Sequence, residues 1–124
     1  MAEDGKKMSK RLKNYPDPSY IFEQYSADSM RYYLLSSPVM LAENLNFSEK
    51  GVNDVLRNVN MILWNVYNFY AMYATESKAE NLKVESENVL DKWILARLNQ
   101  LIVEVTENMD KYNLPKATRP ITEF

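Results

Sequence analysis

The 124-residue sequence contains no cysteine and no histidine. Without cysteine the chain can form no disulfide, thiolate nucleophile or zinc–thiolate site. That absence fits a reducing compartment such as the cytosol. Without histidine it can form no Ser-His-Asp triad, imidazole base or histidine-ligated metal site. We therefore expect this chain to hold no metal ion.

Long apolar runs are missing as well. No stretch approaches the ~20 consecutive apolar residues of a membrane-spanning helix, and no signal-peptide pattern opens the chain. Hydrophobic residues make up 46% of the sequence and charged residues 26%, the balance of an ordinary globular domain. The length is that of one domain, or of one domain with an appendage. The sequence thus predicts a soluble, cytoplasmic protein with no membrane partner.

Only two glycines, Gly5 and Gly51, interrupt the chain, which favours a mainly α fold. Two prolines near residue 17 predict an extended turn, because each proline disfavours helical geometry in the residue before it. Short helices are predicted over 19–25 and 27–36. The stretch 39–47 is predicted to be an irregular connector or a short strand.

Two long amphipathic helices dominate the second half. Ser48 suits the N-cap of a helix that runs to about Tyr73, with apolar residues three or four apart throughout. A polar linker is expected over 75–87, and a second long helix over 86–111. Both have an apolar face, so we expect them to pack antiparallel in a bundle with further helices. Pro115 opens a third helix, which has barely begun at the last residue, and the natural bundle is therefore expected to be larger.

Positive charge is concentrated at the N-terminal end, although the net charge is −2. Five of the first 13 residues are cationic: Lys6, Lys7, Lys10, Arg11 and Lys13. Flexible ammonium groups suit polyphosphate and are most useful where negative charge builds on a leaving group. Composition alone, however, favours a solvated basic tail or a tag junction, because short lysine runs are common and mostly inert. The order of the residues has to decide between these interpretations.

That order resembles a known signature. The run Lys-Met-Ser-Lys-Arg at 7–11 is similar to the KMSKS loop of class I aminoacyl-tRNA synthetases, with Arg11 where the family usually has a second serine. The run Ala-Asp-Ser-Met-Arg at 27–31 resembles the stem-contact helix of the same family. Several later stretches follow in the family's order and resemble its isoleucyl branch, or its anticodon-domain helices: 36–39, 42–45, 47–52, 64–65 and 91–99. The valyl and leucyl branches are the nearest alternatives.

The resemblance implies a function that this chain shares with absent parts. Members of the family activate an amino acid with ATP and magnesium, release pyrophosphate, and transfer the aminoacyl group to tRNA. By this likeness Lys7 and Lys10 are catalytic, and the ATP-binding residues are Lys7, Met8, Ser9, Lys10 and Arg11. The family's histidine-containing signature, amino-acid pocket and editing domain are missing. We therefore expect a fragment of a synthetase that is inactive without its catalytic and editing domains, and whose partners are ATP and an isoleucine tRNA.

The same resemblance divides the chain into three parts. Residues 1–18 would be the signature loop, which is expected to be flexible, 19–47 the stem-contact segment, and 48–124 the N-terminal part of a helical anticodon-binding bundle. Candidate tRNA-binding residues are those with exposed cations or with rings and amides able to meet unpaired bases: Arg57, Trp64, Asn65 and Arg97.

Simpler interpretations of these residues stay open. Trp64 and Trp93 lie beside apolar stripes, which favours packing in a core, and the tyrosines at 67, 70 and 73 favour packing too. The arginines could be solvated or paired with glutamates. Two other functional classes also remain, an autonomous helical interaction module and a stand-alone RNA-binding bundle, both of which would leave the lysine loop unexplained.

Overall fold

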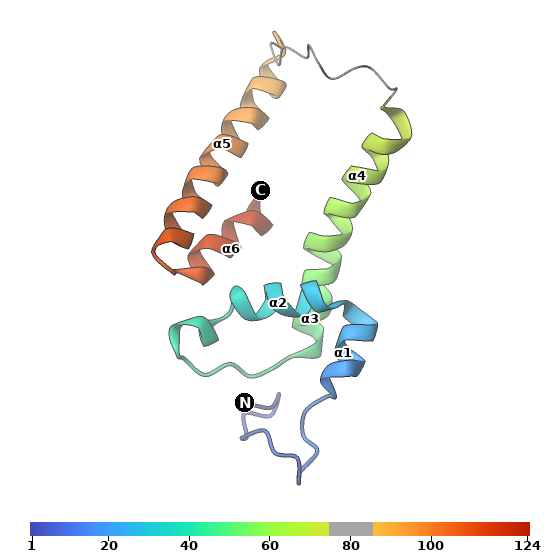
Figure 1. The fold of residues 1–124 in the computed structure, drawn as a ribbon, viewed down its shortest axis with the longest axis vertical. Helices are drawn as coiled ribbons and strands as arrows, with labels where there is room; N and C mark the ends of the chain where they lie inside the picture. Colours follow the sequence, from blue (N-terminus) through green and yellow to red (C-terminus); the bar gives the residue numbers. More distant parts are fainter. Residues whose placement is uncertain (75–85) are drawn as a thin grey trace.

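The computed structural model describes residues 1–74 and 86–124. Across these residues the chain forms helices joined by turns and loops, with no strand, and the predicted mainly α fold is confirmed. Figure 1 shows two long helices that extend in the same direction from a base of shorter ones. Most of the expected linker, 75–85, lies outside the described residues, and 86–88 are coil.

Two short helices form part of the base: α1 (Pro18–Tyr25) and α2 (Ala27–Leu35). Asp17 caps α1 by accepting the Ser19 N–H at 2.8 Å, and Pro18 occupies the first turn, where its missing N–H has no consequence. Both helices were predicted to within one residue at each end. The following connector contains a 3₁₀ turn, η1 (Pro38–Leu41), and then irregular chain, so the strand alternative for 39–47 was wrong.

The first long helical rod has three parts: α3 (Glu49–Val55), a π-helical segment η2 (Leu56–Asn60), and α4 (Met61–Tyr73). Ser48 caps it as predicted, since its hydroxyl accepts the Gly51 N–H at 3.3 Å. The expectation of one uniform α-helix was wrong in the middle. Short π segments occur inside α-helices and are frequent at functional sites.

The second long helix is α5 (Val89–Asp110), which begins three residues later than expected because Asn88 caps it by accepting the Leu90 N–H at 2.9 Å. The last helix, α6 (Leu114–Glu123), turns back and lies against both α5 and the base (Figure 1). Hydrogen bonds join it to α2 and to the C-cap residue of that helix. The Tyr32 hydroxyl donates to the Thr118 carbonyl at 2.5 Å, and Arg119 Nε donates to the carbonyl of the C-cap Ser36 at 3.2 Å.

A small core joins the N-terminal loop to the base. Ile21, Phe47 and Val52 are buried together, and Met8 and Tyr33 pack against them with Tyr25 and Met30. The rings of Tyr33 and Phe47 meet edge to face with centroids 5.7 Å apart. Because these residues come from the loop, α1, α2, the connector and α3, the core fixes the loop relative to the helices.

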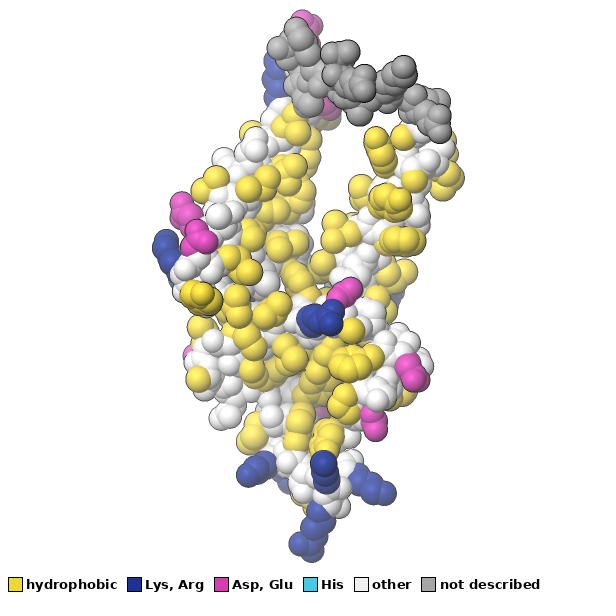
Figure 2. Space-filling view, viewed as in Figure 1, with side chains coloured by type: hydrophobic (Ala, Val, Ile, Leu, Met, Phe, Trp, Pro, Cys, Tyr) yellow, Lys and Arg dark blue, Asp and Glu magenta, His cyan; other side chains and the backbone are white. Residues whose placement is uncertain are grey.

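The two long helices do not form the expected core with each other. Figure 2 shows apolar side chains along both α4 and α5, and most of them are exposed. Trp64 is 62% exposed and Trp93 57% exposed, so core packing was the wrong interpretation for both in this structure. The three tyrosines of α4 are exposed as well, and the ring of Tyr67 lies 5.7 Å from that of Trp64.

Candidate functional site: the lysine loop

Ser9 organises the turn that contains the cationic residues. Its carbonyl accepts the N–H groups of Leu12 at 3.1 Å and Lys13 at 3.0 Å, and its hydroxyl accepts the Arg11 N–H at 3.2 Å. Lys13 has φ = 47°, the left-handed conformation, which ends the turn. Lys10, Arg11 and Leu12 therefore lie on the outside of a tight turn, and all three side chains are exposed.

The side chain of Asn14 closes this turn by bonding to the backbone on its entering side. The Ser9 N–H donates to Asn14 Oδ1 at 2.9 Å, and Asn14 Nδ2 donates to the Lys7 carbonyl at 3.2 Å. One side chain thus joins the chain that enters the turn to the chain that leaves it.

Met8 points the opposite way from its cationic neighbours. It is partly buried against the core, whereas Lys7 and Lys10 are exposed. Two hollows adjoin it, one of about 360 Å³ that also touches Asn14 and one of about 250 Å³ with mainly apolar walls. The alternation places one side chain in the core and presents the lysines to solvent.

The cations of the loop differ in their partners. Lys6 forms an exposed ion pair with Asp4 at 3.4 Å, and its N–H donates to the same carboxylate, which lowers the pKa of Asp4. Across 1–74 and 86–124 no carboxylate forms an ion pair with the other four, which are Lys7, Lys10, Arg11 and Lys13. Figure 2 shows Lys and Arg side chains projecting from the end of the molecule that carries this loop. This end is therefore suited to bind an anion.

Glu49, in the first turn of α3, ties α1 to that helix. Its Oε1 accepts hydrogen bonds from the hydroxyls of Tyr25 at 2.7 Å and Tyr20 at 3.0 Å. These bonds favour the protonated phenols, so they raise the pKa of Tyr20 and raise that of Tyr25 to about 12. The positive end of the α3 dipole also stabilises a carboxylate at this position.

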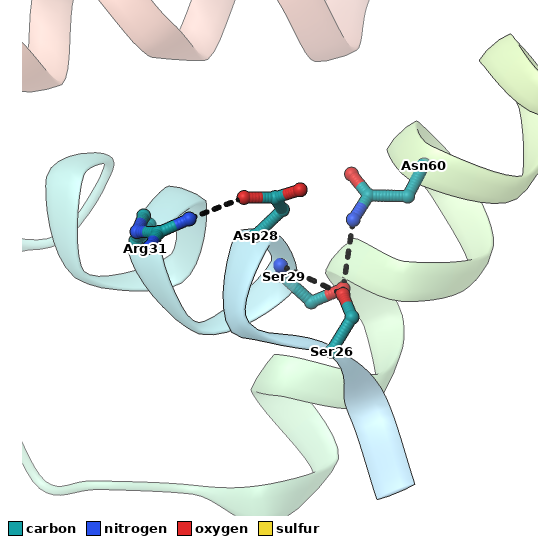
Figure 3. Close-up of polar contacts among 5 residues, drawn as sticks. All are labelled: Ser26, Asp28, Ser29, Arg31 and Asn60. Carbon is teal, nitrogen blue, oxygen red and sulfur yellow. Dashed lines mark hydrogen bonds and ion pairs between the residues drawn. The ribbon is translucent and has the colours of Figure 1, made fainter. Parts of the chain in front are cut away.

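The start of α2 is held against the π segment by a partly buried polar cluster, in which Ser29 is fully buried (Figure 3). Asn60 Nδ2 donates to Ser29 Oγ at 2.9 Å, and the hydroxyls of Ser29 and Ser26 lie 3.0 Å apart. Ser26 also caps α2 by accepting the Ser29 N–H at 3.2 Å, although its own backbone has φ = 71° and ψ = 153°. That conformation is strained for any residue other than glycine. The ion pair between Asp28 and Arg31 beside the cluster is exposed, with 2.6 Å between Asp28 Oδ1 and Arg31 Nη1.

The four residues proposed from the sequence for tRNA contact are spread over the helical part. Arg57 lies in the π segment, Trp64 and Asn65 on α4, and Arg97 on α5, and all are exposed. Arg97 donates to Gln100 at 3.1 Å, and no hydrogen bond or ion pair links the four to one another in the described residues. The structure thus gathers 7–11 in one turn and leaves the helical candidates apart.

Three polar residues of the site were given no role from the sequence: Asn14, Ser29 and Asn60. For Asn14 a signal existed, because asparagine often closes turns by bonding to nearby backbone. Ser29 and Asn60 are 31 residues apart, and no local pattern pairs them.

Two absences concern the described part of the chain alone. Within it, no group of three or more acidic side chains is placed to bind a metal ion together. None of its helices combines the length and the apolarity that crossing a membrane requires.

Two family models match the chain, one in its N-terminal part and one in its C-terminal part. Residues 1–46 match the family model of tRNA synthetases class I (I, L, M and V), and residues 91–124 match that of the anticodon-binding domain of tRNA ligase. The lysine loop and α2 lie in the first match, and most of α5 with α6 in the second.

Relatives match along the whole chain or nearly so. The isoleucine–tRNA ligases of Protochlamydia amoebophila and Bdellovibrio bacteriovorus are 45% and 46% identical over all of this chain. The cytoplasmic isoleucine–tRNA ligase of Schizosaccharomyces pombe is 48% identical over 92% of it. The chain spans 12% of the length of each of these relatives. The chain therefore belongs to the class I aminoacyl-tRNA synthetase family, in which it corresponds to a segment of the isoleucyl branch.

Proposed function

We propose that this chain supplies the ATP-phosphate-binding loop and part of the tRNA-binding helices of an isoleucine–tRNA ligase. The observation that carries the proposal is the turn at 7–11, in which Met8 packs inward while the cations face solvent. The proposed parts are the loop over 1–18, a stem-contact segment over 19–47, and the start of an anticodon-binding bundle over 48–124. The proposed place of action is the cytoplasm, as in the names of the Caenorhabditis elegans and Schizosaccharomyces pombe relatives.

In this proposal the lysines act on the departing pyrophosphate. The carboxylate of isoleucine attacks the α-phosphorus of ATP, the bond to the β,γ-diphosphate breaks, and negative charge builds on the leaving group. The ammonium groups of Lys7 and Lys10 stabilise that charge, as positioned cations do where charge develops in a transition state. Arg11 adds a further donor, and Met8 and Ser9 hold the shape of the turn. The aminoacyl group is then transferred to a ribose hydroxyl of the tRNA, which releases AMP.

Magnesium would arrive with ATP in this scheme. The described residues offer no cluster of acidic side chains to hold it, and Mg²⁺ at nucleotide sites is commonly bound by substrate phosphates with one or two carboxylates. The residues of this chain would bind the phosphates and not the metal.

The exposed residues of the long helices support a role in tRNA binding. Unpaired bases stack on aromatic rings and on arginine, and Trp64, Arg57 and Arg97 are exposed. Asn65, next to Trp64, offers both a donor and an acceptor to a base edge.

Lys10→Ala in the full-length ligase tests the proposal. Loss of one positioned donor of this kind costs about 10²–10³-fold in rate, so isoleucine-dependent ATP–pyrophosphate exchange should fall by that factor. The matched control is Lys116→Ala, which removes an exposed lysine from α6 and should leave the exchange rate unchanged. An undiminished rate in Lys10→Ala contradicts the proposed role. The 124-residue chain alone should show no exchange. Measurable exchange from it would contradict the proposal that it supplies only the phosphate-binding loop and part of the tRNA-binding helices.

A further inference from the structure

Asn14 binds the backbone of the lysine loop at two points. Its Oδ1 accepts the Ser9 N–H at 2.9 Å and its Nδ2 donates to the Lys7 carbonyl at 3.2 Å. The orientation of the amide follows from the partners, because a backbone N–H can only donate and a carbonyl can only accept. The Lys13 N–H also crosses the turn, to the Ser9 carbonyl at 3.0 Å, but in the described residues only Asn14 bonds to the peptide groups on both sides of Met8.

The remaining contacts of the loop cannot replace them. The carbonyl and hydroxyl of Ser9 bond to residues 11–13, which closes the turn on itself. Met8 packs against the core cluster that contains Ile21 and Phe47, which holds its side chain, but no backbone hydrogen bond in the described residues reaches the Lys7 carbonyl or the Ser9 N–H. Asn14 bonds to the residues immediately before and after Met8. Together the two contacts fix the backbone from Lys7 to Ser9.

We propose that Asn14 is a positioning residue that preorganises Lys7 and Lys10 for the transition state. The inference rests on the proposed function of the loop. Donors already in place when charge develops need no ordering during the reaction, and they stabilise the transition state more than donors that must be ordered then. Asn14 is neutral, and its amide is occupied by the backbone. Its loss therefore acts through the lysines and lowers kcat, while ATP binding in the ground state changes little.

Two variants of the full-length ligase separate the parts of this role. Asn14→Asp has nearly the same shape and keeps an acceptor for the Ser9 N–H. It replaces Nδ2, which donates to the Lys7 carbonyl, by an oxygen that cannot donate. Asn14→Ala removes both bonds. For Asn14→Asp we expect kcat of ATP–pyrophosphate exchange to fall about tenfold, since a tenfold change corresponds to about 1.4 kcal/mol and one hydrogen bond contributes about that much. For Asn14→Ala, which loses both bonds, the fall should be at least as large. KM for ATP should stay within about twofold, as expected for an interaction that acts in the transition state.

Trypsin provides a readout that does not depend on activity. Cleavage after Lys10 and Arg11 should become severalfold faster in both variants at an unchanged melting temperature, because the loop is less ordered. Asn44→Asp is the matched control. It introduces the same charge in the exposed connector, at a side chain that has no hydrogen bond in the part of the chain described, and should alter neither rate.

The outcomes distinguish this inference from the proposed function. If Lys10→Ala loses activity while both Asn14 variants keep the wild-type kcat, the positioning role is overturned and the proposed function stands. A rise in KM for ATP at unchanged kcat also overturns it, since Asn14 would then serve ATP binding itself. Wild-type cleavage by trypsin in both variants overturns the structural basis of the inference. If Lys10→Ala loses nothing, the proposed function fails first.

Discussion

Replacement of Gly51 by alanine should destabilise the protein, although the same change in an ordinary helix stabilises it. Gly51 lies inside α3, where glycine costs about 1 kcal/mol relative to alanine. A β-carbon built at this position would lie 2.6 Å from Cε2 of the Tyr33 ring, which is far inside contact distance. The absence of a side chain therefore permits the close approach of α2 and α3.

Tyr33 cannot move aside freely, and this sets the magnitude. Its hydroxyl accepts the Ser48 N–H at 3.1 Å, and its ring packs edge to face on Phe47. Overpacking a core costs about 1–3 kcal/mol. Displacement of the ring also weakens the hydrogen bond, worth about 0.5–1.5 kcal/mol. After the helix-propensity gain of about 1 kcal/mol, Gly51→Ala should lower the free energy of unfolding by about 2 kcal/mol.

Urea unfolding of the chain, followed by far-ultraviolet circular dichroism, measures this change. The control Asn53→Ala lies in the same helix and should be neutral or slightly stabilising. In a Tyr33→Leu background the ring is gone, so Gly51→Ala should become neutral or stabilising, and the double-mutant cycle isolates the clash. A stabilised Gly51→Ala in the wild-type background would refute the close approach of the two helices.

Three further predictions follow from other parts of the structure. Ser26→Ala should lower the free energy of unfolding by about 1 kcal/mol, through loss of the α2 cap. Ser26→Gly should lower it by less, because glycine also removes the backbone strain. Equal losses of the two variants in urea unfolding would contradict the presence of strain at Ser26. The pKa of Tyr25 is raised from 10.0 to about 12, so its hydrogen bond to Glu49 stabilises the protein fully below pH 10 and is lost as the pH rises towards 12. In pH-dependent melting the wild type should therefore lose more stability than Tyr25→Phe between pH 10 and pH 12. Equal losses in the two proteins would contradict this stabilising role of the hydrogen bond. Trp64→Ala in the full-length ligase should weaken binding of isoleucine tRNA by about 1–3 kcal/mol in filter binding at fixed salt, and Trp64→Phe should retain most of the affinity; an unchanged affinity in Trp64→Ala would remove this residue from the tRNA-binding set.

Local signals accounted for most of the secondary structure. Ser48 was identified as a cap because its hydroxyl needs only the N–H three residues ahead, and Pro115 was placed in a first turn because its own geometry favours that position. The π segment escaped prediction, since apolar spacing of three or four residues tolerates one wider turn. The exposure of α4 and α5 escaped it too, because an amphipathic pattern predicts that a face will be buried without identifying what covers it.

The sequence by itself determined that the chain is helical and that a cluster of cations lies near its N-terminal end in the order of a known signature. Both properties depend on residues close together along the chain. The tertiary structure decided which of those residues are held and which are exposed. Met8 packs against a core that contains Ile21 and Phe47, and a hydrogen bond between Ser29 and Asn60 joins the start of α2 to the π segment. These contacts join residues distant in sequence, and the folded chain is what brings them within bonding distance.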